Sequence, residues 1–175
     1  MESSNPQASG LAVQQLAALA EIASLLGQRP FDYWLFGGWA VDFHVGVATR
    51  SHGDIDLAVW AAEAQAIRSA LLTSGWKHRP EPDDDGGTGY ERDGVRVELT
   101  YLVQGESDEV FIAIGEQDVL WADRPLGDDV LQLGGVRARV VPLEHLRRAK
   151  SKPRDDPDDA EIDRADFAVL TRLDT

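Results

Sequence analysis

Residues 35 to 60 read LFGGWAVDFHVGVATRSHGDIDLAVW. This stretch carries two adjacent glycines, Gly37 and Gly38, and then two aspartates separated by one residue, Asp54 and Asp56, in otherwise apolar surroundings. An unpaired carboxylate is costly to bury in a strand that packs against a core. The pair of aspartates therefore predicts a cationic partner, and other features of the chain indicate which one.

The segments on either side of the glycines predict a strand, a tight turn and a helix. The apolar run 33–36 is typical of a buried strand, and residues 39–45 of a helix that follows the turn. Residues 54–60 predict a second strand in which apolar residues alternate with Asp54 and Asp56. Side chains two positions apart on a strand point to the same face, so the two carboxylates lie a few ångströms apart.

The rest of the chain predicts one domain. A disordered lead-in is expected over residues 1–10, followed by a single domain over 11–175, with a core at 31–104 and a hairpin and helices at 105–175. The other expected elements are a helix over Leu11–Leu26, a helix over Ala61–Ser74, a solvated acidic loop over 81–89, a hairpin turning at Asp93-Gly94, a hairpin over 130–141, a helix from Pro142 to Lys150 and a helix over Ala160–Leu170.

Composition excludes several classes of protein. The 175 residues are enough for one buried core, and the absence of cysteine excludes disulfides and thiolate metal sites. No basic leader precedes an apolar run. A membrane span needs about 18 apolar residues in a row, and no window of the sequence reaches that length. We therefore expect no membrane partner and a cytoplasmic location. The net charge of −14 disfavours nucleic acid and favours a polycation, although solubility alone also accounts for it.

A third acid and the glycine turn complete a candidate site. Glu98 is the central polar residue of an alternating strand, and on a strand beside Asp54 and Asp56 it would allow two divalent ions, Mg²⁺ or alternatively Mn²⁺, to bind. The helix that begins at Gly37-Gly38 offers backbone N–H groups to phosphate. The turn fits neither the P-loop nor the dinucleotide fingerprint, so it indicates phosphate binding only together with the carboxylates.

The run YWLFGGWAVDFHVGVATRSHGDIDLAVW resembles the signature of the antibiotic nucleotidyltransferases, the lincosamide and aminoglycoside (2″) enzymes of the DNA polymerase β-like superfamily. RVELTYLV resembles the strand that carries their third carboxylate, and RVVPLEHLRRAK and IDRADFAVL resemble their closing segments. The resemblance covers most of residues 31–104 and, more loosely, 136–170. Two departures stand out: Glu98 replaces the usual aspartate, and Ile162 stands where a basic residue is expected.

The resemblance implies an α+β fold of the polymerase β-like minimal nucleotidyltransferase type, a mixed sheet flanked by helices with further helices at the C-terminus. It also implies an enzyme whose nucleoside triphosphate, expected to be ATP, is attacked at the α-phosphorus by a hydroxyl of a small acceptor, with release of pyrophosphate. The implied roles are metal binding by Asp54, Asp56 and Glu98, proton acceptance by Glu98, and binding of the triphosphate by Gly37, Gly38, Arg50 and Lys150.

Several of these residues have alternative interpretations. Arg50 is equally suited to capping the 39–45 helix or pairing with Asp42, and Lys150 to neutralising the end of its own helix. His52 supports Asp54 by a hydrogen bond or has no ligand role.

The acceptor is the least determined feature. An acidic cleft suits a small cationic aminoglycoside, whereas a lincosamide carries one amine and gains less from that field. Two rival functions stay open: a toxin-like nucleotidyltransferase that acts on tRNA or protein, and a non-catalytic nucleotide-binding partner protein. The sequence leaves monomer and homodimer undecided.

Overall fold

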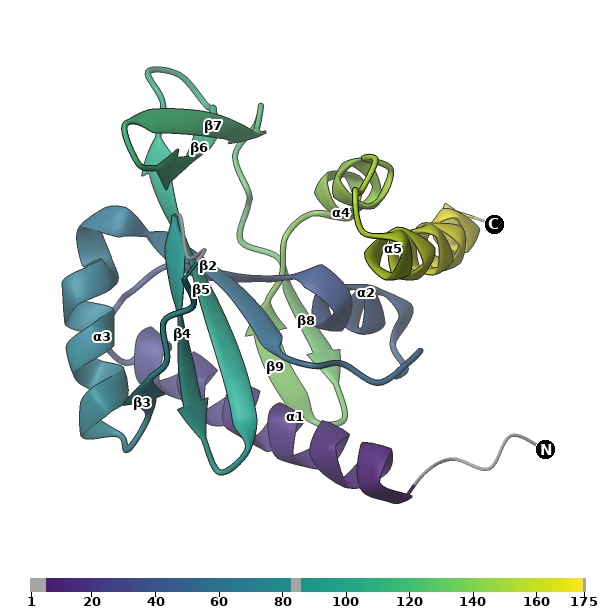
Figure 1. Ribbon diagram of the computed structural model, residues 1–175, viewed down its shortest axis with the longest axis horizontal. Helices are drawn as coiled ribbons and strands as arrows, with labels where there is room; N and C mark the ends of the chain where they lie inside the picture. The colour runs from purple at the N-terminus through teal and green to yellow at the C-terminus, as the bar shows by residue number, and fades with distance from the viewer. Residues whose placement is uncertain (1–5, 83–85, 175) are drawn as a thin grey trace.

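The central sheet of the computed structural model is mixed (Figure 1), and Asp56 and Glu98 lie opposite each other on its paired strands β2 and β5. The structure describes residues 6–82 and 86–174. The main path of the seven-stranded sheet runs β1-β2-β5-β4-β3, and β2 and β5 are parallel whereas the other pairs are antiparallel. These strands are β1 Tyr33–Phe36, β2 Ile55–Trp60, β3 Lys77–His78, β4 Gly87–Arg92 and β5 Val95–Gln104. The expected α+β class is confirmed.

The strand, turn and helix predicted around the two glycines are present. β1 ends at Phe36 and α2 (Gly37–Val45) begins at the next residue, with Gly37 at a positive φ of 66° that favours glycine. Gly46 closes the helix in the left-handed conformation, and its N–H donates to the Asp42 carbonyl. The turn therefore places the first turn of α2 directly at the end of a buried strand.

The register of β2 and β5 determines which acids become neighbours. Asp56 lies opposite Glu98, and Ile55 lies opposite Val97. The apolar side chains of β5 alternate into the core, which leaves Glu98 on the other face. The hairpin between β4 and β5 turns at Asp93-Gly94, both at positive φ, as this dipeptide predicts.

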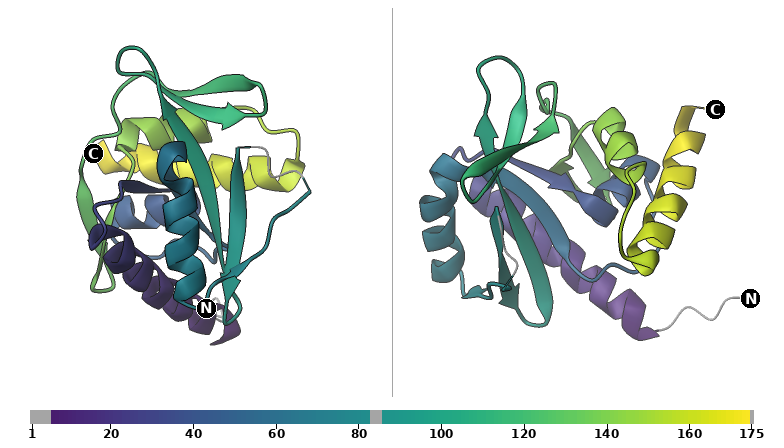
Figure 2. Two further views of the ribbon diagram at one scale, coloured as in Figure 1. Left: turned by 90° about the vertical axis from the view of Figure 1, so that its left-hand side faces the viewer. Right: turned by 45° about the horizontal axis from the view of Figure 1, so that its top comes forward.

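Helices cover the sheet on both faces (Figures 1 and 2). α1 and α3 lie on one side, where α1 contacts α3, β5 and β9, and α2, α4 and α5 gather on the other side and contact one another. Their bounds are α1 Pro6–Gly27, α3 Ala64–Thr73, α4 Leu143–Lys150 and α5 Pro157–Leu170, with short 3-10 turns over Ala61–Glu63 and Thr171–Asp174. The candidate site lies on the side of α2, α4 and α5.

The expected starts of the first and last α-helices were wrong. α1 begins at Pro6, so residues 6–10 are helical rather than part of a lead-in, whereas residues 1–5 lie outside the described residues. α5 begins at Pro157 because the Asp156 carboxylate accepts hydrogen bonds from the N–H groups of Asp158 and Asp159 and caps the helix.

The acidic loop expected over residues 81–89 is shorter than predicted. Residues 87–89 belong to β4, which pairs with β5, and residues 83–85 lie outside the described residues.

The first helix also corrects an expectation about membranes. The helical segment Gly10–Gly27 is, by length and composition, long and apolar enough to cross a membrane. The sequence analysis expected no such segment. Core helices meet the same criterion. In the structure Leu19, Ile22 and Leu26 of this helix are fully buried in the core.

One hairpin was not predicted. β6 (Val110–Ile114) and β7 (Gln117–Ala122) extend the sheet beyond β5, where Leu102 pairs with Ile112. The second hairpin, β8 (Val130–Leu133) and β9 (Val136–Arg139), was predicted and forms a separate two-stranded sheet. The unpredicted hairpin brings Trp121 over the candidate site.

Candidate active site

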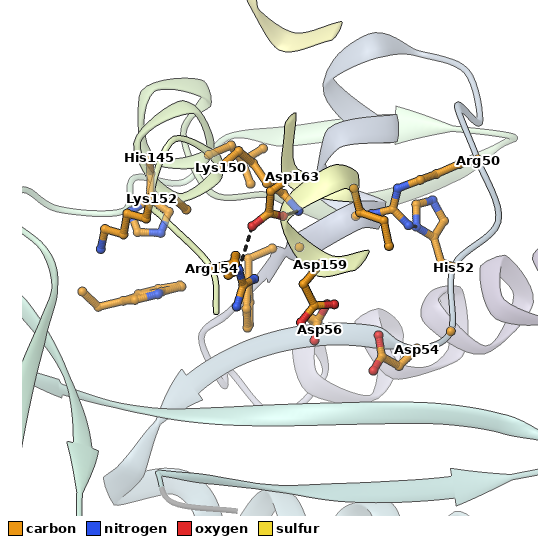
Figure 3. Close-up of a pocket in the computed structure, with 18 of the residues that line it drawn as sticks. Arg50, His52, Asp54, Asp56, His145, Lys150, Lys152, Arg154, Asp159 and Asp163 are labelled. Atoms are coloured by element: carbon orange, nitrogen blue, oxygen red, sulfur yellow. Dashed lines mark hydrogen bonds and ion pairs between the residues drawn. The ribbon is translucent and has the colours of Figure 1, made fainter. Parts of the chain in front are cut away.

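A pocket of about 620 Å³ opens where the end of β1, the start of β2 and helices α4 and α5 meet (Figure 3). Six of the seven residues that the sequence singled out line it: Gly37, Gly38, Arg50, Asp54, Asp56 and Lys150. Glu98 is not among the lining residues. The structure therefore brings the glycine turn, the aspartate pair and both expected cations to one cavity.

The two aspartates carry negative charge that their surroundings do not fully neutralise. Burial, together with the charges of Asp54 and Glu98, raises the pKa of Asp56 to about 7. Burial also raises the pKa of Asp54. The Asp56 carboxylate lies so close to Gly37 that a Cβ at position 37 would overlap its Oδ2 atom. Gly37 is thus needed both for the turn and for the room that Asp56 occupies.

Glu98 lies beside the aspartates but is engaged elsewhere. The β2–β5 register sets it opposite Asp56, as expected, and its charge contributes to the raised pKa of Asp56. Its Oε1 atom accepts a hydrogen bond from the Nε atom of Arg96, whose Nη1 atom lies 2.7 Å from Glu81. In the described part of the chain, no three or more His, Asp or Glu side chains are arranged to hold a metal ion.

The donor set nevertheless fits a hard divalent cation. Asp54 and Asp56 offer carboxylate oxygens, the ligands that Mg²⁺ and Mn²⁺ prefer, and a cation would offset both the burial of Asp56 and its repulsion by Asp54 and Glu98, which together raise its pKa. Glu98 has the right chemistry to join them once Arg96 releases it. These three residues are the ones that would hold the metal.

The first turn of α2 faces the pocket, where its backbone N–H groups are available to an anion. Its N-cap residue, Phe36, has no side chain that could accept the first N–H groups of the helix. Backbone N–H groups and the positive end of the helix dipole favour a phosphate at such a terminus. Gly38 is required there for a second reason, because a Cβ at position 38 would overlap the side chains of Arg50 and His52.

Arg50 is held by Asp166 of α5, a partner that the sequence did not predict. Its Nε and Nη2 atoms donate to the two carboxylate oxygens of Asp166 at 3.0 and 2.9 Å. Its Nη1 atom donates to the carbonyl of Ser51 and to Nδ1 of His52. Arg50 therefore neither caps α2 nor pairs with Asp42. One N–H of its Nη2 atom is left for a ligand, counted over these four contacts.

Asp42 and His52 form a buried pair behind Arg50. His52 Nε2 lies 2.6 Å from the Asp42 carboxylate, which also accepts from the backbone N–H of Thr49. His52 does not bond Asp54, so that interpretation was wrong. Because Arg50 can only donate, Nδ1 of His52 must accept and Nε2 must carry the proton. Asp42 thus fixes the imidazole that in turn orients Arg50.

Lys150 is fixed by the same helix. Its Nζ atom lies 2.8 Å from Asp163 and 2.8 Å from Asp166. Asp163 also accepts from the Nε atom of Arg154 at 2.7 Å. Burial alone would raise the pKa of Asp163 and Asp166. Hydrogen bonds from Arg154 and Lys150 hold the pKa of Asp163 below its ordinary value, and those from Arg50 and Lys150 do the same for Asp166.

The resemblance noted in the sequence included the segment IDRADFAVL, which contains Asp163 and Asp166, but gave neither residue a role. Together with Leu170 they are the buried residues of α5, at positions i, i+3 and i+7. This spacing marks one helix face, and two acids on a face that packs against the protein require buried cations as partners. That pattern was the signal that could have revealed them.

The pocket is richer in cations than the chain as a whole. The net charge of the protein is −14, yet the lining of this cavity holds as many cations as acids: Arg50, Lys150, Lys152 and Arg154 beside Asp54, Asp56, Asp159 and Asp163. An anion with several charges would find here both side-chain cations and backbone donors.

Comparison with known proteins identifies similar proteins. A family model described as aminoglycoside-2″-adenylyltransferase matches residues 18–170. A 2″-aminoglycoside nucleotidyltransferase of Klebsiella pneumoniae is 40% identical over 43 residues, which are 25% of this chain and 24% of that protein. The alignment with this curated relative thus spans about a quarter of its length.

Two solved structures share the fold at low sequence identity. The lincosamide antibiotic adenylyltransferase LnuA, bound to lincomycin, superposes with a TM-score of 0.67 at 19% identity and covers 87% of this chain and 94% of its own. ANT(2″)-Ia in complex with adenylyl-2″-tobramycin gives a TM-score of 0.63 at 19% identity and covers 91% of this chain and 88% of its own.

Proposed function

Because the chain belongs to the aminoglycoside-2″-adenylyltransferase family, whose members are nucleotidyltransferases that modify antibiotics, we propose that it transfers AMP from ATP to a hydroxyl group of an aminoglycoside. The observation that carries this proposal is the pocket in which the aspartate pair faces a glycine-led helix terminus and four cations. In the reaction, the acceptor oxygen forms a bond to the α-phosphorus of ATP. The bond from that phosphorus to the bridging oxygen of the β-phosphate breaks, and pyrophosphate leaves.

The triphosphate has a defined set of donors in this pocket. The N–H groups at Gly37 and Gly38 bind phosphate oxygens. The remaining N–H of Arg50 is one further donor. Lys150 has a third N–H in addition to the two whose hydrogen bonds Asp163 and Asp166 accept. Asp166 contacts both cations, so a single carboxylate holds the two phosphate ligands at a fixed spacing.

Nucleotidyltransferases of this kind generally use divalent metal ions, and we propose Mg²⁺, with two ions held by Asp54, Asp56 and Glu98 and with Mn²⁺ as a substitute. Bound divalent ions supply charge neutralisation on the phosphates and on the leaving pyrophosphate. The chain's own contribution is to hold the carboxylates on adjacent strands, where the Asp56–Glu98 register keeps them together.

Glu98 is the proposed acceptor of the proton that leaves the attacking hydroxyl. Its carboxylate is engaged by Arg96 in this structure, so it reaches the substrate after that hydrogen bond is released. Arg96 is itself shared with Glu81, which offers the guanidinium an alternative partner at 2.7 Å.

The preferred acceptor is an aminoglycoside because of charge. The ammonium groups of such a molecule are attracted by the strongly negative field of this protein, whereas a lincosamide with one amine gains less. A lincosamide is the second candidate, favoured by the likeness to LnuA in fold. We place the reaction in the cytoplasm, whose reducing conditions suit a chain without cysteine.

The test is a transfer assay with defined products. The protein is incubated with Mg²⁺, each of the four nucleoside triphosphates and a panel that includes tobramycin and lincomycin, and the acceptors are analysed by mass spectrometry. We expect a mass gain of one AMP on tobramycin and release of pyrophosphate. Modification of tRNA or protein would favour the toxin-like alternative, and ATP binding without any transfer would favour a nucleotide-binding partner protein.

A further inference from the structure

One end of the pocket is lined by aromatic rings. The Phe36 and Trp121 rings meet edge to face with centroids 5.3 Å apart, and the Trp121 and His145 rings meet in the same way at 4.4 Å. All three residues line the pocket, and none is fully buried. They come from β1, β7 and α4, so the surface exists only in the folded protein.

This aromatic surface adjoins the phosphate site. Phe36 pairs with Asp56 across β1 and β2, and it immediately precedes the glycine turn. Trp121 therefore contacts the side chain of Phe36, the residue that pairs with Asp56. The base of a nucleotide whose phosphates bind at the turn would extend past Phe36 toward Trp121.

His145 is chemically idle in the protein itself. It makes a ring contact with Trp121 but no hydrogen bond to any residue that the structure describes. Burial, together with the charges of Lys152 and Arg148, lowers the pKa of His145 to about 4. The imidazole is thus neutral at physiological pH, with one donor and one acceptor nitrogen unused.

The charges at this end bear on which substrate binds there. Lys152 lines the pocket near His145, whereas Asp163 pairs with Arg154 and Asp123 pairs with Arg148. Figure 3 shows His145 and Lys152 at the opposite end of the pocket from Arg50, His52 and Asp54. Lys152 repels an ammonium group of a polycationic acceptor at this end, whereas an uncharged flat base is not repelled.

We propose that Trp121 and His145 form the binding site for the base of the nucleotide, Trp121 by stacking and His145 by a hydrogen bond to the base edge. The acceptor then approaches from the end of the pocket where Asp54 lies. This inference rests on the proposed function, because it needs the triphosphate to bind at the glycine turn.

The test separates the base from the phosphates by using two ligands. Binding of ATP and of inorganic tripolyphosphate, both with Mg²⁺, is measured by calorimetry for the wild type and for Trp121→Leu, Trp121→Phe, His145→Ala and Leu120→Ala. Leu120 is the matched control because it is an exposed neighbour of Trp121 on the same strand and does not line the pocket.

We expect Trp121→Leu to weaken ATP binding by about tenfold to a hundredfold, since stacking of one base contributes about 1–3 kcal/mol. Trp121→Phe should retain most of the affinity because it keeps an aromatic face, and His145→Ala should show a loss of about tenfold. Tripolyphosphate should bind all variants as it binds the wild type.

Three results would overturn the inference. If Trp121→Leu weakened the binding of ATP and of tripolyphosphate by the same factor, Trp121 would act only by supporting Phe36 and the turn. If it kept its affinity for ATP but lost affinity for tobramycin, titrated in the same way, the aromatic surface would belong to the acceptor. If the wild type bound neither ATP nor tripolyphosphate, the proposed function would fail together with this site, a pattern that the first two results do not produce.

Discussion

Arg50 and Asp166 are joined by two hydrogen bonds, of 3.0 and 2.9 Å, although 116 positions separate them in the chain. Asp166 is 3% exposed and also contacts Lys150, so it links the helix that closes the domain to both cations of the proposed phosphate site. A bidentate carboxylate fixes the plane of a guanidinium as well as its position. The orientation of Arg50 is therefore a property of tertiary packing.

Asp166→Asn should weaken ATP binding by about tenfold and lower the free energy of unfolding by about 2 kcal/mol. The substitution keeps the volume of the side chain but leaves two cations without their shared charge partner. ATP titration and urea unfolding measure the two effects. Glu161→Gln, an exposed acid on the same helix, is the control and should change neither. Unchanged ATP affinity in Asp166→Asn would show that Arg50 and Lys150 do not depend on it.

The same carboxylate predicts a dependence of stability on pH. The pKa of Asp166 is lower in the folded protein than in the unfolded chain, so its ionised form stabilises the fold. This contribution is present above the ordinary aspartate pKa of about 3.8 and is lost as pH falls through the folded value. Acid unfolding of Asp166→Asn should hence be less steep than that of the wild type below about pH 4. Identical slopes would mean that the pair contributes nothing.

Gly38→Ala should reduce ATP affinity by about tenfold while the protein stays folded. The added Cβ overlaps Arg50 and His52, so the guanidinium must move away from the start of α2. Gly53→Ala is a matched control, because Gly53 also lines the pocket but a Cβ there meets nothing within 4 Å. Circular dichroism and ATP titration check both variants, and equal affinities for the two would contradict the role given to Gly38.

Glu98→Gln should reduce the rate of transfer by about a hundredfold to ten-thousandfold, the usual contribution of a general base, with a much smaller loss of ATP affinity. The amide keeps the shape of the side chain but accepts no proton at neutral pH. Steady-state kinetics with varied ATP separate the two effects. Equal losses in rate and affinity would assign Glu98 to substrate anchoring alone.

The parts of the fold with strong local signals could be predicted from the sequence. The glycine pair after an apolar run and the Asp93-Gly94 turn each restrict the backbone within a few residues, and both turned where expected. The β6–β7 hairpin was missed because most of β7 is exposed, which removes the alternation of buried and exposed side chains that identifies a strand.

The candidate site divides in the same way. Asp54 and Asp56 are two positions apart, so strand geometry alone places their side chains together, whereas the glycines reach Asp56 through the pairing of β1 with β2. The partners of the cations could not be predicted so directly. Asp163 and Asp166 reach Arg50 and Lys150 only because α5 packs beside α2 and α4, and His52 turns to Asp42 because α2 lies behind it.

The central claim is that the carboxylates of the aspartate pair take part in AMP transfer, and Asp56 is the residue on which to test it. The rate of pyrophosphate release with ATP, Mg²⁺ and tobramycin should fall by about a thousandfold or more in Asp56→Asn, because a metal ligand is removed at nearly constant volume. Asp159→Asn, which changes an exposed acid in the same pocket, should keep the wild-type rate. A wild-type rate in a folded Asp56→Asn variant would contradict the account.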